Sequence, residues 1–150
     1  MNVSENLEMW TAGACYPDGT GSWGWIARAG ERELTRSGVI AATTTCNRAE
    51  MLAVINAMES LYHQKDRLLF YKVMIFNSNS YTVGAFTKWT VREKTRNQDL
   101  IAQYSLLHLD LQQAGCHVDI HWVRSGIGGM VDSARTLAAQ ARWSTGAVAA

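Results

Sequence analysis

Thr44-Thr45-Cys46-Asn47-Arg48-Ala49-Glu50 opens the segment of this sequence that decides the fold. Apolar residues then recur at helical spacing as far as Tyr62. The threonines before the run are candidate helix caps. The pattern predicts a helix over 47–62, and the elements on either side can be placed relative to it.

Three strand-like segments precede this helix, at 7–15, 22–29 and 32–39. They are rich in Trp, Thr, Ile and Val, which favour strands. Turn residues join them at Pro17-Asp18-Gly19 and Ala29-Gly30-Glu31. Because both connections are short, we expect an antiparallel meander.

The segments after the helix alternate between strand and helix patterns. Residues 71–76 are almost wholly apolar, as expected of a central strand buried on both faces. Helices are predicted at about 79–89 and 98–114, a strand at 117–122 and a last helix whose apolar face runs from Met130 to Ala141. The order βββαβααβα predicts an α/β (α+β) sandwich.

Length and composition limit what the chain can be. It has 150 residues, of which 47% are hydrophobic and 18% charged, and a formal net charge of +1. This is enough chain for one hydrophobic core, so we expect one domain over 1–143 and a flexible tail over 144–150. The small net charge excludes a histone-like arm, so any binding of nucleic acid must come from a local cluster.

The three cysteines, Cys15, Cys46 and Cys116, are far apart and lack CxxC spacing. This pattern argues against a disulfide scaffold or a zinc site, and we interpret all three as ordinary buried thiols in a reducing compartment. No apolar run approaches the roughly 20 residues of a membrane span, and the N-terminus lacks the regions of a signal peptide. We therefore expect a cytoplasmic protein that does not bind membranes.

Further motifs follow one another in a recognisable order. They are residues 10–15 (WTAGAC), Gly24 and Trp25, 44–50, 78–81 (SNSY), 87–89 (TKW), 97–100, 121–124 (HWVR), and Leu137 with Ala138. In this order the chain resembles type 1 ribonuclease H over roughly residues 7–142. The resemblance implies a five-stranded mixed sheet with helices on both faces. It also implies a hydrolase of RNA/DNA hybrids, in which four carboxylates hold two divalent ions about 3.5 to 4 Å apart.

Only one of the four carboxylate positions implied by the resemblance holds an acid. The four positions fall on Ala12, Glu50, Ser78 and Arg135, and the position of an assisting loop histidine falls on Gly126. Shifting the third position by one residue gives Asn77 or Asn79, so neither register restores a carboxylate.

Arg135 reverses the charge expected at its position. A positive charge about 4 Å from a dication costs roughly 8 kcal/mol at an effective dielectric constant near 20. We therefore expect a catalytically inactive ribonuclease H-like protein with a degenerate site and without the Mg²⁺ or Mn²⁺ of the family.

Glu50, Arg135 and Asp132 each have two interpretations. Glu50 is either a relic ligand or, with Asn47, part of a capping box. Arg135 either pairs with Glu50 inside the vacated site or lies on a solvated helix face. Asp132 either helps to hold one weakly bound ion or complements the dipole of the last helix, and we favour the dipole.

Two further patterns are more often structural than functional. His117, Asp119 and His121 could imitate a metal triad, but alternation favours a solvated face opposite buried neighbours. Tryptophans could stack on bases, but three that lie on predicted strands are expected in the core: Trp10, Trp25 and Trp122.

Residues 88–96 form the most basic stretch of the chain, with an aromatic residue among the charges. In the resembling family this region grips the DNA strand of a hybrid, and contacts of Lys and Arg to phosphates need no metal. The candidate nucleic-acid-binding residues are Asn47, Arg48, Lys88, Trp89, Arg92, Lys94, Arg96 and Asn97. The alternative is a merely solvated charged loop.

Three functions follow, in order of preference. The first is an inactive module that binds RNA/DNA hybrid or duplex nucleic acid. The second is a structural subunit that uses the fold as a docking surface for a protein partner. The third is weak manganese-dependent ribonuclease activity through Glu50 and Asp132.

Overall fold

A computed structural model describes residues 6–64, 72–126 and 129–149. The elements are β1 (Asn6–Cys15), β2 (Gly21–Ala29), β3 (Arg32–Ile40), α1 (Cys46–His63), β4 (Lys72–Asn77), α2 (Ser80–Thr87), α3 (Gln98–Gln113), β5 (His117–Trp122) and α4 (Met130–Ala149). Their order confirms the predicted βββαβααβα pattern. Tyr71, the expected start of the fourth strand, lies outside the described residues.

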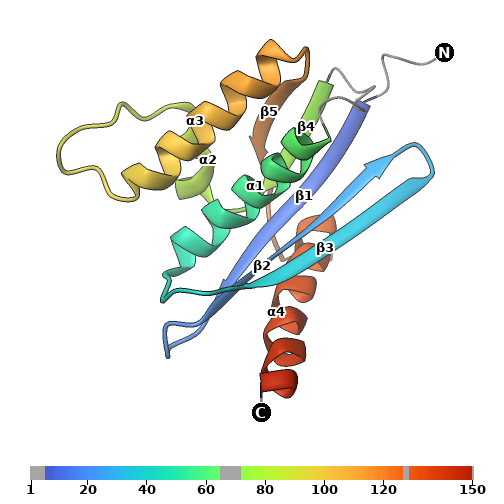
Figure 1. The fold of residues 1–150 in the computed structure, drawn as a ribbon, viewed down its shortest axis with the longest axis vertical. Helices are drawn as coiled ribbons and strands as arrows, with labels where there is room; N and C mark the ends of the chain where they lie inside the picture. The colour runs from blue at the N-terminus through green and yellow to red at the C-terminus, as the bar shows by residue number, and fades with distance from the viewer. Residues whose placement is uncertain (1–5, 65–71, 127–128, 150) are drawn as a thin grey trace.

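The strands form one mixed five-stranded sheet in the order β3-β2-β1-β4-β5. The first three strands pair antiparallel, whereas β4 pairs parallel with both β1 and β5. Figure 1 shows α1, α2 and α3 on one face of the sheet and α4 across the other. The predicted α/β sandwich with helices on both faces is therefore confirmed.

A separate apolar cluster fills each side of the sheet. The larger one packs α1 and α3 against alternate residues of the strands, including Met9 and Ile75. The smaller one packs α4 against the opposite face, around Ala12 and Ile26. Side chains alternate along a strand, so β1 contributes to both clusters.

Two glycines allow the helices to approach the sheet closely. A Cβ at Gly13 would overlap the backbone of Ala49 and Glu50 at the start of α1. A Cβ at Gly24 would lie 2.6 Å from the carbonyl oxygen of Ala134 on α4. These contacts fix the positions from which α1 and α4 direct their polar side chains toward the end of β1.

The structure corrects the prediction for Trp122, which is 52% exposed. Val118 and Ile120 are buried as predicted. Trp122 is the last residue of the edge strand β5 and lies beyond the helices that cover this strand. Its indole N–H donates to the carbonyl of Ser78. Trp25 is in the core, and Trp10 is half-buried beside the smaller cluster.

The cysteine prediction is wrong for two of the three residues. Cys15 and Cys46 form a disulfide, with Cα atoms 5.0 Å apart, and only Cys116 is a buried free thiol. Spacing along the sequence could not show this, because the pairing depends on β1 ending beside the start of α1. The cysteines therefore give no support to the inference of a reducing compartment.

The last helix is longer than predicted. It continues to Ala149, into the segment that was expected to be a flexible tail. In the part of the chain that the structure describes, no helix has the length and apolarity needed to cross a membrane.

Candidate functional site

Glu50 lies near the start of α1 and is only 7% exposed. Its Oε1 accepts a hydrogen bond from the backbone N–H of Gly13 on β1. The helix is capped instead by Thr45, whose side chain accepts from the N–H of Arg48 at 3.2 Å. The capping-box interpretation of Asn47 and Glu50 is therefore wrong, and Glu50 points into the junction between β1 and α1.

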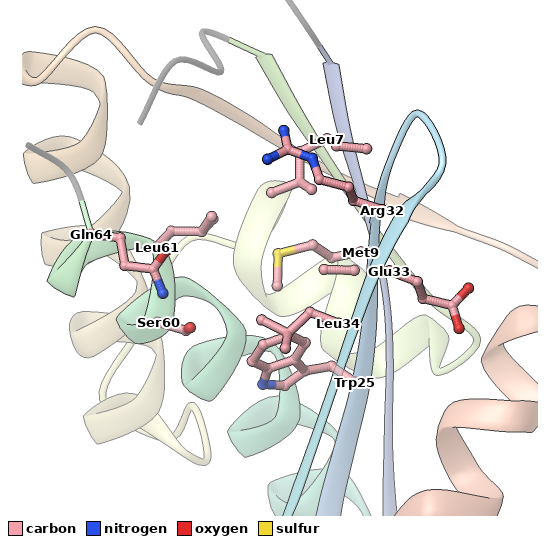
Figure 2. A pocket seen from close by; sticks show the side chains of 11 residues that line it. Leu7, Met9, Trp25, Arg32, Glu33, Leu34, Ser60, Leu61 and Gln64 are labelled. Atoms are coloured by element: carbon pink, nitrogen blue, oxygen red, sulfur yellow. The ribbon is translucent and has the colours of Figure 1, made fainter. Parts of the chain in front are cut away.

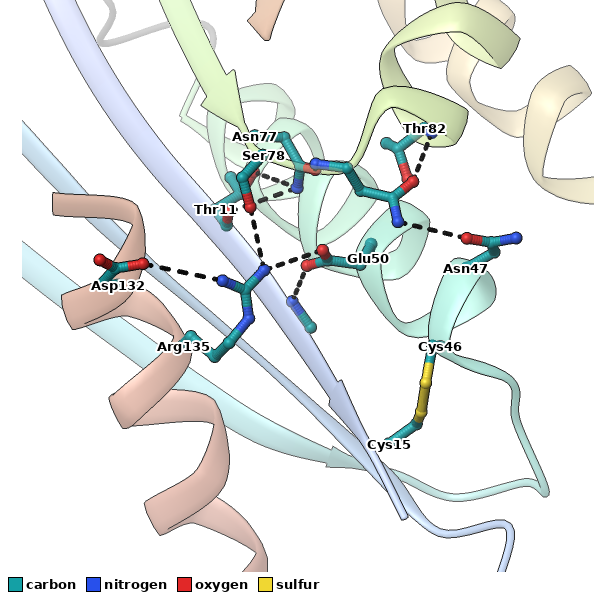
Figure 3. Close-up of polar contacts among 12 residues, drawn as sticks. Thr11, Cys15, Cys46, Asn47, Glu50, Asn77, Ser78, Thr82, Asp132 and Arg135 are labelled. Atoms are coloured by element: carbon teal, nitrogen blue, oxygen red, sulfur yellow. Dashed lines mark hydrogen bonds and ion pairs between the residues drawn. A yellow bond between two sulfur atoms is a disulfide. The ribbon is translucent and has the colours of Figure 1, made fainter. Parts of the chain in front are cut away.

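Arg135 reaches this junction from α4 and occupies it with its guanidinium group (Figure 3). Its Nη2 donates to Oε2 of Glu50 at 2.9 Å and to Oγ of Ser78 at 3.1 Å. Its Nη1 lies 3.9 Å from Asp132, one turn earlier on the same helix. The predicted pairing of Arg135 with Glu50 is confirmed, and the solvated-face alternative is wrong.

The ion pair is partly shielded from water. The side chain of Arg135 is 35% exposed, whereas that of Glu50 is 9% exposed. Burial raises the pKa of Glu50 above its ordinary value, although the Gly13 N–H and the charge of Arg135 act in the opposite direction. Both carboxylate oxygens of Glu50 accept hydrogen bonds from this chain, one from the Gly13 N–H and the other from Arg135.

The four positions carried over from the resemblance converge in space. Ala12 is fully buried on β1 and belongs to the cluster under α4. Ser78 directly follows β4 and accepts a hydrogen bond from Arg135, which also donates to Glu50. Gly126 is linked to this group through Asp132: its backbone N–H donates to both carboxylate oxygens at 3.1 Å. Asp132 also lies in the first turn of α4, where an acid complements the helix dipole.

A buried polar bridge beside the site was not predicted. Asn77, at the end of β4, is fully buried and donates through Nδ2 to the hydroxyl of Thr11 at 3.0 Å. The Thr11 hydroxyl donates to the carbonyl of Phe76, and Asn77 Oδ1 accepts from the N–H of Asn79. The only sequence signal was an asparagine at the end of an apolar strand. The bridge fixes where Ser78 leaves the sheet.

The start of α1 is tied to the start of α3 by Arg48. Its guanidinium donates to both carboxylate oxygens of Asp99, at 3.0 and 2.8 Å, and to Asn97 Oδ1 at 3.1 Å. The hydrogen bonds from Arg48 hold the pKa of the Asp99 carboxyl below its ordinary value. Asp99 thus offsets the positive charge of Arg48.

The start of α2 joins the same arrangement. Asn79 caps α2 by accepting from the N–H of Thr82, and its Nδ2 donates to Oδ1 of Asn47 on α1. Asn97 Nδ2 donates to the hydroxyl of Tyr81. The N-termini of three helices are therefore held together, and each carries the partial positive charge of a helix dipole.

The basic stretch lies between α2 and α3. Lys88, Arg92, Lys94 and Arg96 are all exposed, and none has a carboxylate partner among the described residues. Trp89 is 44% exposed and packs edge-on against the Tyr81 ring at 4.7 Å.

Gln98 holds the connection between α2 and α3 in place. Its side-chain amide donates to the carbonyls of Arg92, Glu93 and Thr95. The stretch therefore has a defined shape as well as charge.

Two features lie away from this site. His117, Asp119 and His121 are exposed on β5, and within 6–64, 72–126 and 129–149 no three acidic, His or Cys side chains are grouped as metal ligands. A largely apolar pocket of about 250 Å³ lies beside the C-terminal end of α1, at the opposite end of that helix from Glu50 (Figure 2).

Comparisons with known proteins agree with the fold described above. The RNase H family model matches residues 4–141. A ribonuclease H of Bordetella pertussis is 33% identical over 131 residues, covering 83% of this chain and 80% of the relative. A ribonuclease H of Halorhodospira halophila is 35% identical over 129 residues, covering 81% of this chain and 82% of the relative.

Solved structures share the fold at lower sequence identity. The N-terminal RNase H domain of a Mycobacterium tuberculosis protein superposes with a TM-score of 0.75 at 17% identity, covering 98% of this chain and 100% of that chain. LC11-RNase H1, solved in complex with an RNA/DNA hybrid, gives a TM-score of 0.75 at 18% identity, covering 93% of this chain and 98% of that one.

Proposed function

Because the chain belongs to the ribonuclease H family, we propose that it is a catalytically inactive member that binds nucleic acid. The ligand class is RNA/DNA hybrid or duplex, bound without metal-dependent cleavage. The proposal rests mainly on the guanidinium of Arg135, which donates hydrogen bonds to Glu50 and Ser78. It lies where the resemblance implies that carboxylates would hold metal ions.

The donor set at these positions does not fit a pair of divalent cations. Such ions take oxygen ligands, preferably carboxylates, but Ala12 offers none and Ser78 only a hydroxyl. Glu50 already accepts hydrogen bonds on both oxygens. The positive charge of Arg135 would repel each ion, so we derive no metal-dependent step for this chain.

Binding of the nucleic-acid backbone needs none of these ligands. The exposed cations of residues 88–96 suit phosphates, and the three joined helix N-termini add partial positive charge beside them. Asn47 and Asn97 can contribute hydrogen bonds to sugars or phosphates. A solved relative of this fold in complex with an RNA/DNA hybrid supports the choice of ligand class.

A binding titration in EDTA tests this proposal. Labelled RNA/DNA hybrid, duplex DNA, duplex RNA and single strands are titrated at about 50 and 200 mM salt. We expect salt-sensitive binding that prefers hybrid or duplex. The variants Lys88→Ala, Arg92→Ala and Lys94→Ala should each weaken binding and reduce the slope of log K against log salt by about 1.

Arg36→Ala is the matched control, because Arg36 lies exposed on β3 at the opposite edge of the sheet from β5. It should leave the slope unchanged. Absence of binding to all ligands at low salt would contradict the binding role. Cleavage of labelled hybrid in Mn²⁺, abolished by Glu50→Gln, would contradict the proposed inactivity.

A second candidate function is supported by two exposed leucines on α3. Leu106 and Leu109 are 64% and 49% exposed and lie three residues apart, so they share one helix face. Such a face suits a protein partner better than a nucleic acid. A complex that survives high salt and is lost in the Leu106→Glu/Leu109→Glu variant would favour this alternative.

A further inference from the structure

The end of β1 and the start of α1 are joined by a covalent bond as well as by packing. Cys15 is the last residue of β1 and Cys46 the first of α1, and they are 31 positions apart in the chain (Figure 3). We propose that these two residues form a reversible thiol–disulfide switch that locks the start of α1 onto the end of β1.

The junction has enough other contacts to persist when the bond is reduced. The backbone of Ala49 packs against Gly13, leaving no room for a Cβ, and Glu50 accepts from the Gly13 N–H. Thr45 caps the helix independently. Because these contacts keep the two sulfur atoms near each other in the reduced protein, the bond can form again without refolding.

The exposure of the three cysteines suits such a switch. Cys46 is exposed and Cys15 half-buried, so a small thiol or disulfide can reach the pair. Cys116 is buried and remains a free thiol. Burial raises the pKa of the Cys116 thiol, which keeps it protonated and poorly reactive.

The chemistry is thiol–disulfide exchange with a low-molecular-weight disulfide such as glutathione disulfide. The Cys46 thiolate attacks one sulfur of the reagent and releases one glutathione thiolate, forming a mixed disulfide. The Cys15 thiolate then attacks the Cys46 sulfur and releases the second glutathione. Two protein thiols are oxidised, one glutathione disulfide is reduced to two thiols, and the two thiol protons pass to solvent or to the released thiolates.

Oxidation should stabilise the fold, because it removes the freedom of a 31-residue segment from the unfolded chain. For a domain of this size we expect the melting temperature of the oxidised protein to exceed that of the reduced protein by about 5–10 °C. The effect does not depend on binding of nucleic acid, so it can be tested whether or not the proposed function holds.

The test uses the full chain equilibrated with glutathione disulfide or with excess reductant. Alkylation followed by mass spectrometry identifies the bonded cysteines, thermal unfolding gives the melting temperature, and hydrogen exchange follows the Gly13 amide. We expect a Cys15–Cys46 bond, a higher melting temperature and slower Gly13 exchange in the oxidised form. Cys116→Ala should keep the redox dependence of wild type, and Cys15→Ser/Cys46→Ser should lose it.

Either of two results would overturn the switch. One is that both thiols remain open to alkylation after incubation with excess glutathione disulfide. The other is that the oxidised and reduced forms have the same melting temperature and the same exchange rate at Gly13. Both comparisons use wild-type protein, so they do not depend on the folding of any variant.

Discussion

Arg135 on α4 and Glu50 on α1 form an ion pair, with Nη2 2.9 Å from Oε2. The two helices lie on opposite faces of the sheet, so the pair links the two layers beside β1, where β4 has ended. The positions at which the resemblance implies metal ligands are thus occupied by an interaction within the chain. Because this link joins two layers of the fold, removal of Glu50 should lower the free energy of unfolding.

We expect Glu50→Ala to lower the free energy of unfolding by about 2 kcal/mol, because it leaves the Gly13 N–H and the Arg135 guanidinium without their acceptor. The value is below that of fully buried pairs because Arg135 is 35% exposed. Glu50→Gln keeps an acceptor oxygen and should cost less than half as much. Urea unfolding measures both. Glu59→Ala on the same helix is the control, and an equal effect there would show that the Glu50 contacts add nothing.

The stability difference between wild type and Glu50→Gln should depend on pH. Burial raises the pKa of Glu50 above its ordinary value of 4.5, so the folded protein binds this proton at a higher pH than the unfolded chain. The resulting contribution to stability is fully present below about pH 4.5. It is lost as the pH rises through the pKa of Glu50 in the folded protein.

Wild type should therefore lose stability relative to Glu50→Gln as the pH rises above about 4.5. Urea unfolding of both proteins at several pH values measures this, and the comparison cancels the titration of all other groups that the two share. A wild-type advantage that grows with pH would show that the charge of Arg135 outweighs burial at this carboxyl.

Gly13→Ala should destabilise the protein by about 2–3 kcal/mol, because the added methyl group overlaps the backbone of Ala49 and Glu50. The strand and the helix must then separate at the site. Thermal or urea unfolding measures the loss. Gly129→Ala is the matched control, since a Cβ there meets nothing within 4 Å. Similar effects for the two variants would mean that the close approach at Gly13 is not required.

Most of the fold could be predicted from periodicity and turn chemistry, because those signals are local. The helix predicted at 47–62 and the strand predicted at 117–122 both agree with the structure to within one residue at each end. Exposure of Trp122 could not be predicted in this way, since alternation gives the face of a strand but not how far a neighbouring helix extends over it.

The contacts of the candidate site were predictable only in part. The opposite charges of Glu50 and Arg135, at positions that the resemblance brings together, predicted their ion pair. The bond between Cys15 and Cys46 and the buried bridge from Asn77 to Thr11 join residues 31 and 66 positions apart. Such pairings depend on strand register and helix approach, which composition and spacing do not specify.

The proposed absence of a metal site can be tested by introducing carboxylates at the converging positions. In the variant Ala12→Asp/Ser78→Asp/Arg135→Asp, three new acids join Glu50 at positions that converge. In EDTA we expect a lower melting temperature than in wild type, because like charges are then close together. Mn²⁺ at about 100 times its Kd should raise the melting temperature by roughly 5–10 °C, since binding to the folded state adds about 2.7 kcal/mol.

Wild type should show almost no shift with Mn²⁺, because Arg135 supplies a positive charge where the ions would bind. Arg36→Asp, which makes the same change of charge at an exposed position on β3, should resemble wild type and so controls for nonspecific binding. The single variant Arg135→Asp serves as a second test, with a smaller shift, should the triple variant fail to fold. A wild-type shift as large as that of these variants would mean that the guanidinium does not exclude the metal.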